Sequence, residues 1–179
     1  SLRQKLIKEE EKREKANIHA HYDLGNELFD IFLDPTKTYS CAYFKHENDS
    51  LYEAQMNKID LSLRKLFLKP GEKLLDIGCG WGELIIYAAK KYNVHAYGIT
   101  LSEEQYKTAK ERINKEGLDG RCDVILENYL DLDSDDYRFD KIVSIGMFEH
   151  VGKNYLPLYF NKVSHLLKPG GLFLLHSIL

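Results

Sequence analysis

The residues from Asp76 to Gly82 have the types and spacing to hold a small molecule. The run Asp76-x-Gly78-x-Gly80-x-Gly82 follows a short apolar stretch and leads into an amphipathic one that begins near Leu84. Glycine lets a ligand approach the backbone closely, and the first turn of a helix offers N–H groups without partners inside the helix. This run therefore predicts a binding crevice at the carboxyl end of a strand. A turn that only packs a helix on a strand is the alternative.

Two classes of ligand compete for such a turn. A dinucleotide site uses the spacing G-x-G-x-x-G and an acidic residue about 20 residues further on, which holds the ribose. Here the glycines are spaced G-x-G-x-G, and the next predicted strand leads into Thr100 rather than Asp or Glu. Both features argue against NAD. Residues 76–82 instead resemble the first motif of the class I S-adenosylmethionine-dependent methyltransferases, in which the amino-acid part of the cofactor lies against this turn.

Polar residues after the second and third predicted strands are candidates for the rest of the cofactor site. Many of these methyltransferases carry an acidic residue at the position of Thr100, so Gln105 is the candidate for the ribose contact here. Ser102-x-x-Gln105 also fits a capping box at the start of a helix, and the two roles are compatible. By the same resemblance, Asn128 and Tyr129 lie where such enzymes hold the adenine.

Alternating apolar segments supply the frame for these residues. Strands are predicted over 73–77, 94–99, 122–126, 140–146 and 171–178, and helices near 83–92, 103–116 and 153–167. Continuous apolar runs are typical of parallel strands covered on both faces, so we expect an α/β fold with a doubly wound, mainly parallel sheet. Residues 71–179 would form this cofactor-binding core. The chain stops inside its fifth predicted strand, and we interpret it as part of a longer protein.

Residues 1–70 are predicted to form a helical segment with a loop that covers cofactor and substrate. Residues 2–16 are highly charged, and this weakly basic arm is either a membrane contact or a solvated helix face. Residues 22–33 show helical spacing. A further helix begins at Ser50, where Ser50 and Glu53 form a capping box. Its expected core stripe is Leu51, Ile59, Leu63 and Leu66.

Four further segments narrow the family. They are 21–26 (HYDLGN), 38–44 (TYSCAYF), 144–152 (SIGMFEHVG) and 174–178 (LLHSI). Together, from about residue 15 onward, they resemble the cyclopropane-fatty-acid synthases and mycolic acid cyclopropane synthases. The resemblance implies methyl transfer from S-adenosylmethionine to a cis double bond of an unsaturated phospholipid acyl chain. Loss of a proton from the resulting carbocation to a bound bicarbonate would close the cyclopropane ring.

The resemblance also implies which residues hold the bicarbonate: Cys41, Glu149, His176 and the backbone of Ile178. We expect Glu149 to be a buried carboxylate that accepts the bicarbonate hydroxyl hydrogen, while imidazole and backbone N–H groups donate to the bicarbonate oxygens. Taken alone, Glu149 could be a structural cap and His176 a core histidine. Cys41 with His176 could also suggest a thiol nucleophile, but nothing else in the sequence supports the oxyanion hole which that chemistry needs.

Several aromatic residues could serve the cofactor or the cation. Tyr39, with Ser40, resembles the family's contacts to the cofactor. Tyr22, Tyr43 and Phe148 could face the carbocation, because aromatic rings attract positive charge when solvent is excluded. Each of these rings could equally belong to the core.

The composition excludes other classes of protein. The chain has 179 residues, which favours one domain, and its net charge of −3 lacks the basic excess of nucleic-acid binders. No apolar run approaches the ~18 residues that span a bilayer. The cysteines at 41, 79 and 122 are odd in number and far apart, which argues against a disulfide framework and a zinc site.

We therefore expect a cytoplasmic enzyme, without a metal, at the inner membrane surface, and a homodimer is left open. The alternatives are a related methyltransferase that makes methyl-branched or oxygenated lipids or methylates a small molecule, and a cofactor-binding module without activity of its own.

Overall fold

A parallel β-sheet forms the centre of the computed structural model, which describes residues 29, 31–133 and 135–178. The strand order is β3-β2-β1-β4-β5, and every neighbouring pair is parallel. The strands are β1 (Lys73–Ile77), β2 (His95–Thr100), β3 (Cys122–Leu126), β4 (Phe139–Ile145) and β5 (Leu167–His176). The expected doubly wound α/β sheet is confirmed.

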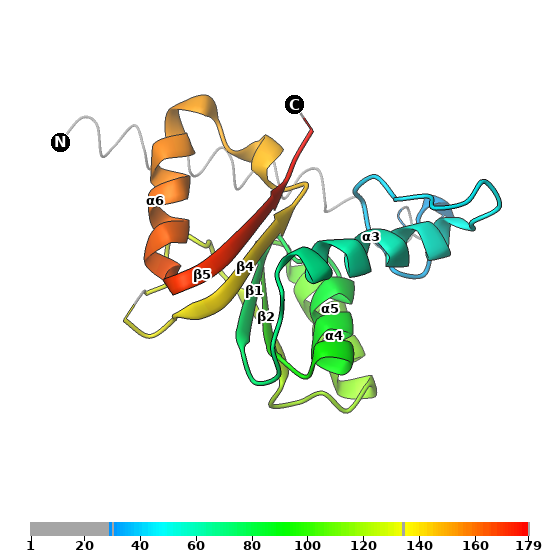
Figure 1. The fold of residues 1–179 in the computed structure, drawn as a ribbon, viewed down its shortest axis with the longest axis horizontal. Coiled ribbons are helices and arrows are strands. Elements are labelled where there is room, and N and C mark those ends of the chain that lie inside the picture. The colour runs from blue at the N-terminus through cyan, green and yellow to red at the C-terminus, as the bar shows by residue number, and fades with distance from the viewer. Residues whose placement is uncertain (1–28, 30, 134, 179) are drawn as a thin grey trace.

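Helices cover both faces of the sheet (Figure 1). On one face lie α4 (Glu83–Tyr92) and α5 (Glu103–Lys115), and on the other lies α6 (Leu156–Leu166). Helix α3 (Leu51–Lys65) precedes the sheet and contacts α4, since Lys91 of α4 forms an ion pair with Asp60 of α3 at 2.6 Å. Two short 3-10 helices, η1 (Phe148–His150) and η2 (Lys153–Tyr155), connect β4 to α6.

Strand β1 contributes to two cores. Leu74 belongs to the cluster formed with α3, α4 and α5, whereas Leu75 and Ile77 belong to the cluster that contains Tyr159 and Val163 of α6. All three β1 side chains are at most 1% exposed. Both faces of the strand are therefore buried, and this explains why its apolar side chains do not alternate with polar ones at Leu74 and Leu75.

Helix α3 begins as the sequence predicts. The Ser50 hydroxyl accepts from Glu53 N, and the Glu53 carboxylate accepts from Ser50 N at 2.8 Å, so the capping box is confirmed. Ile59, Leu63 and Leu66 are buried, but Leu51 is 41% exposed and does not belong to the core stripe. Its place in the first turn explains the difference, because that end of α3 extends beyond the sheet (Figure 1).

The fifth strand differs most from its predicted bounds of 171–178. It begins at Leu167, which pairs with Phe139, and the register shifts between Phe139 and Lys141. It ends at His176, because the chain turns there and the Ile178 N–H bonds to Glu149 instead of to a strand.

Smaller differences affect other elements. Strand β2 is shifted by one residue toward Thr100, strand β4 is shifted by one residue toward Phe139, and α5 ends at Lys115. The predicted helix 153–167 starts with η2 and becomes α-helical at Leu156. Residues 2–16 and most of 22–33 lie outside the described residues. Within the described part of the chain, no helix combines the length and the apolar character needed to cross a membrane.

Candidate functional site

A cavity of about 410 Å³ lies beyond the carboxyl end of β1. The chain leaves β1 toward β2 on one side and later returns to β4 on the other, and this switch in direction opens a crevice at the carboxyl edge. All the residues that the sequence predicts to bind the cofactor or the bicarbonate line this cavity. They are Tyr39, Ser40, Cys41, Asp76, Gly78, Gly80, Thr100, Gln105, Asn128, Tyr129, Glu149, His176 and Ile178.

The glycine turn forms the floor between β1 and α4. Gly78, Gly80 and Gly82 have φ values of +85°, +54° and +86°, a region that other residues rarely adopt. A Cβ at Gly78 would lie 2.8 Å from the Cβ of Met147, so this position needs glycine for space as well. At Gly80 a Cβ would meet nothing within 4 Å, because this residue borders the open cavity.

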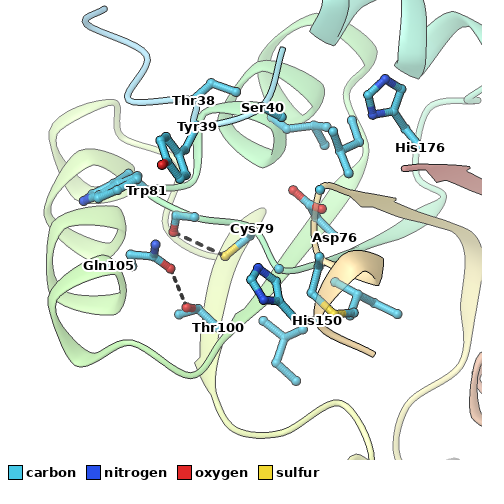
Figure 2. Close-up of a pocket in the computed structure, with 18 of the residues that line it drawn as sticks. Thr38, Tyr39, Ser40, Asp76, Cys79, Trp81, Thr100, Gln105, His150 and His176 are labelled. Carbon is cyan, nitrogen blue, oxygen red and sulfur yellow. Dashed lines mark hydrogen bonds between the residues drawn. The ribbon is translucent and has the colours of Figure 1, made fainter. Parts of the chain in front are cut away.

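Thr100 determines how Gln105 presents its amide. The Thr100 hydroxyl donates to Gln105 Oε1 at 2.8 Å (Figure 2). Ser102 Oγ accepts from Gln105 N at 3.3 Å, but the Gln105 side chain bonds to Thr100, so the predicted reciprocal capping box is only half formed. Because the Gln105 carbonyl is engaged, its amide nitrogen is the atom available to a ligand.

An aromatic cluster borders the glycine turn, and two of its members, Phe29 and Trp81, are not among the residues that the sequence predicts for the site. Phe29 packs edge-on against Trp81, with ring centroids 5.0 Å apart, and against Tyr39, at 5.7 Å. Figure 2 shows Tyr39 and Trp81 on the same side of the cavity. In the sequence, only the position of Trp81 inside the glycine run indicates that an aromatic ring lies near this turn.

Two buried ionisable groups face the cavity from α3 and β1. Lys58 is 5% exposed and Asp76 is 4% exposed. Burial raises the pKa of Asp76 to about 7, an effect that the positive charge of Lys58 opposes. Burial also lowers the pKa of Lys58 to about 8, opposed by Cys41, Asp34 and Asp76. Sequence reasoning missed Lys58, because lysine on an amphipathic helix is normally solvated.

The remaining predicted residues gather at the ends of β4 and β5. His176 is the last residue of β5, and its Nδ1 atom is buried with no hydrogen-bond partner in the described part of the chain. Glu149 lies in η1 and accepts from the Ile178 N–H at 2.8 Å, and its side chain is exposed rather than buried. The Cys41 thiol is exposed and lines the same cavity. A buried imidazole atom without a partner indicates that a ligand completes this region.

Two further expectations turn out differently. Tyr43 and Phe148 do not line the cavity: Tyr43 is 45% exposed, and the Phe148 ring packs 5.3 Å from Tyr159. His150, which the sequence analysis gave no role, ends η1 and lines the cavity. Tyr22 lies outside the described residues. No group of three His, Cys, Asp or Glu side chains in the described ranges is placed to hold a metal ion.

Known proteins resemble this chain over most of its length. The family model for mycolic acid cyclopropane synthetase matches residues 9–179. The chain is 52% identical over 158 residues to the cyclopropane-fatty-acyl-phospholipid synthase of Escherichia coli K12, covering 88% of this chain and 39% of that protein. It is 46% identical over 161 residues to a probable fatty acid methyltransferase of Pseudomonas putida, covering 90% of this chain and 41% of that protein.

A solved structure extends the likeness to three dimensions. The mycolic acid cyclopropane synthase CmaA1, complexed with SAH and CTAB, superposes with a TM-score of 0.85 at 43% identity, covering 90% of this chain and 55% of that one. The chain thus spans about two-fifths of the length of the two curated relatives and about half of this one. Since the family model matches nearly all of its residues, the chain belongs to the mycolic acid cyclopropane synthetase family, with the class I methyltransferase fold.

Proposed function

We propose that this chain binds S-adenosylmethionine and serves the conversion of cis double bonds in phospholipid acyl chains to cyclopropane rings. One observation carries the proposal: the glycine turn, the 38–41 segment and the ends of β4 and β5 all line a single cavity. The name of the E. coli relative and the SAH bound to the solved relative support the reaction and the cofactor.

The residues present fit the cofactor in their chemistry. The glycine turn would receive the amino-acid end, because its backbone borders open space at Gly80. The Gln105 amide would bind the ribose, held in place by Thr100. Asn128 and Tyr129, beyond β3, would contact the adenine. When bound, S-adenosylmethionine supplies an electrophilic methyl group.

The polar residues at the ends of β4 and β5 would hold bicarbonate as the base that closes the ring. His176 offers a buried ring nitrogen without a partner, and Glu149 offers carboxylate oxygens. The Cys41 thiol completes the proposed set, and the Ile178 N–H, which the structure bonds to Glu149 Oε1 rather than leaving it free for bicarbonate, would orient that carboxylate. A carbocation needs this base within a site that excludes water, because water would otherwise capture the cation. The substrate class also implies work at a membrane surface.

Two measurements test the proposal. Calorimetry of the chain with S-adenosylhomocysteine should give micromolar binding; no binding by a cooperatively folded sample would overturn the cofactor assignment. For the reaction, these residues can replace the matching 158-residue segment of the E. coli relative. The chimaera, given methyl-labelled S-adenosylmethionine and vesicles of unsaturated phospholipid, should form labelled cyclopropane acyl chains. A folded chimaera that binds the cofactor but yields no such product would contradict the proposed reaction.

A second candidate is methyl transfer to the carboxylate oxygen of a fatty acid, without ring closure, which the name of the P. putida relative favours. The two reactions differ in their need for a base: ring closure releases a proton, whereas a carboxylate that attacks the methyl group has no proton to lose. Cyclopropane formation should depend on bicarbonate and give ring methylene protons in the NMR spectrum of the product. A fatty acid methyl ester, formed at the same rate without bicarbonate, would favour the second candidate.

A further inference from the structure

The segment 38–41 carries residues for both halves of the proposed site. Tyr39 and Ser40 are proposed cofactor contacts, and the adjacent Cys41 is a proposed contact of the base. Figure 2 shows Thr38, Tyr39 and Ser40 along one side of the cavity. The position of this segment therefore affects both the proposed cofactor contacts and the proposed base contact. Side chains of α3 hold the segment in place.

Two buried polar side chains of α3 hold the segment. Gln55 Nε2 donates to the carbonyl oxygens of Thr38 at 3.2 Å and of Ser40 at 2.9 Å. Lys58 Nζ donates to Ser40 Oγ at 2.6 Å. Gln55 and Lys58 lie three residues apart, and so are neighbours on one face of the helix, and they are 3% and 5% exposed.

Ser40 also lies close to the end of β4. Gly146 follows β4 with φ +73°, and a Cβ built on it would lie 3.4 Å from the Cβ of Ser40. The Gly146 N–H donates to the carbonyl oxygen of His176 at 3.1 Å. Ser40 is thus bonded to Lys58 on α3 and lies near Gly146, which is itself bonded to the last residue of β5.

The charge of Lys58 has a chemical consequence for Ser40. An ammonium group can only donate, so the Ser40 hydroxyl must accept from it and is left with its own hydrogen to donate elsewhere. Burying an ammonium group against neutral oxygen atoms costs free energy that a methionine would avoid. No ion pair within the described residues offsets that cost, although Asp34 and Asp76 act on Lys58 from a distance.

We propose that Lys58 is a positioning residue that orients the Ser40 hydroxyl as a donor to the carboxylate of the cofactor's amino-acid end. This inference rests on the function proposed above. It makes α3 part of cofactor recognition, although no α3 residue belongs to the motifs that identify the family.

Calorimetry of the chain with two ligands tests this role. S-adenosylhomocysteine carries the amino-acid end, whereas 5′-methylthioadenosine shares its nucleoside and thioether but lacks that end. Lys58→Met should bind S-adenosylhomocysteine about tenfold more weakly, as expected for a hydrogen-bond network with a charged group, and methylthioadenosine within about twofold of the unmodified chain. Lys65→Met, an exposed position on the same helix, should leave both affinities unchanged.

A double-mutant cycle shows whether Lys58 affects cofactor affinity through Ser40 or independently of it. Ser40→Ala should give the same loss for S-adenosylhomocysteine, and the double variant should bind no more weakly than either single variant. Lys58→Arg should restore part of the affinity. Because Ser40 is outside the core, Ser40→Ala gives an answer even if Lys58→Met fails to fold: an unchanged affinity of Ser40→Ala would overturn the inference.

The outcomes against the inference are distinct from failure of the proposed function. Equal losses for both ligands would show a general structural role for Lys58, and additive losses would show that it does not act through Ser40. An unchanged affinity of Lys58→Met would overturn the inference alone. Failure of the unmodified chain to bind S-adenosylhomocysteine would overturn the proposed function and this inference with it.

Discussion

The backbone N–H of Ile178 donates to Oε1 of Glu149 at 2.8 Å, which joins the segment after β5 to the 3-10 helix after β4. These residues are far apart in the sequence, and both line the cavity. The bond ends β5 at His176, and it fixes the Glu149 carboxylate to the backbone of Ile178. The Glu149 carboxylate is thus placed independently of any cofactor contact.

Glu149→Gln tests this separation. The amide oxygen can still accept from Ile178, so S-adenosylhomocysteine should bind within about twofold of the unmodified affinity. Turnover of the chimaera should fall by about 100-fold or more, because the amide is a weaker acceptor toward the bicarbonate hydroxyl. Glu111→Gln, an exposed site on α5, is the control. A tenfold loss of cofactor affinity would place Glu149 in the cofactor site instead.

Gly80→Val should abolish cofactor binding. Gly80 has φ +54°, borders the cavity and has no atom within 4 Å of an added Cβ, so valine would fill the space proposed for the ligand. Gly120→Val is a matched control, because Gly120 has φ +84° and open space but does not line the cavity. Calorimetry should show loss of binding only for Gly80→Val. Equal effects of the two variants would assign the loss to backbone strain.

Thr100→Val should weaken cofactor binding through Gln105. Loss of the 2.8 Å hydrogen bond frees the Gln105 amide, and a net value of about 1 kcal/mol corresponds to about fivefold in affinity. The effect should be equal for S-adenosylhomocysteine and methylthioadenosine, since both contain the ribose, in contrast to Lys58→Met. Thr100→Ser should retain affinity. An effect restricted to S-adenosylhomocysteine would contradict the ribose role of Gln105.

Asp76 should make the stability of the unliganded chain depend on pH. Its pKa rises from 3.8 to about 7 on folding, so the folded state holds the proton more tightly. This contribution to stability is complete below about pH 4 and is lost as the pH rises toward 7. Relative to Asp76→Asn, the loss has an upper limit of roughly 4 kcal/mol.

Urea unfolding at pH 4.5 and 7.5 measures this dependence. The free energy of unfolding of the unmodified chain should fall over this interval relative to Asp76→Asn, which has no proton to lose. Parallel pH profiles of the two proteins would show that Asp76 stays charged in the folded state.

Much of the fold follows from local sequence patterns. Residues 73–77, 83–92 and 122–126 occur as predicted. Strand β1 is mostly apolar because both of its faces are buried, and α4 shows amphipathic spacing because it packs on the sheet with one face. The capping box of Ser50 and Glu53 is predictable from the sequence because its hydrogen bonds lie within four consecutive residues. The glycine run likewise predicts its turn, since three positive φ values demand residues without a side chain.

Only the tertiary structure decides the contacts between distant segments. It ends β5 at His176 through the bond from Ile178 to Glu149, and it turns the Gln105 side chain from Ser102 to Thr100. It also buries Lys58. From the sequence alone this lysine is expected to be exposed to solvent on α3, but the fold packs Ser40 against it. Periodicity records whether a side chain is buried on average, whereas the partner of a polar atom depends on which segments the fold brings together.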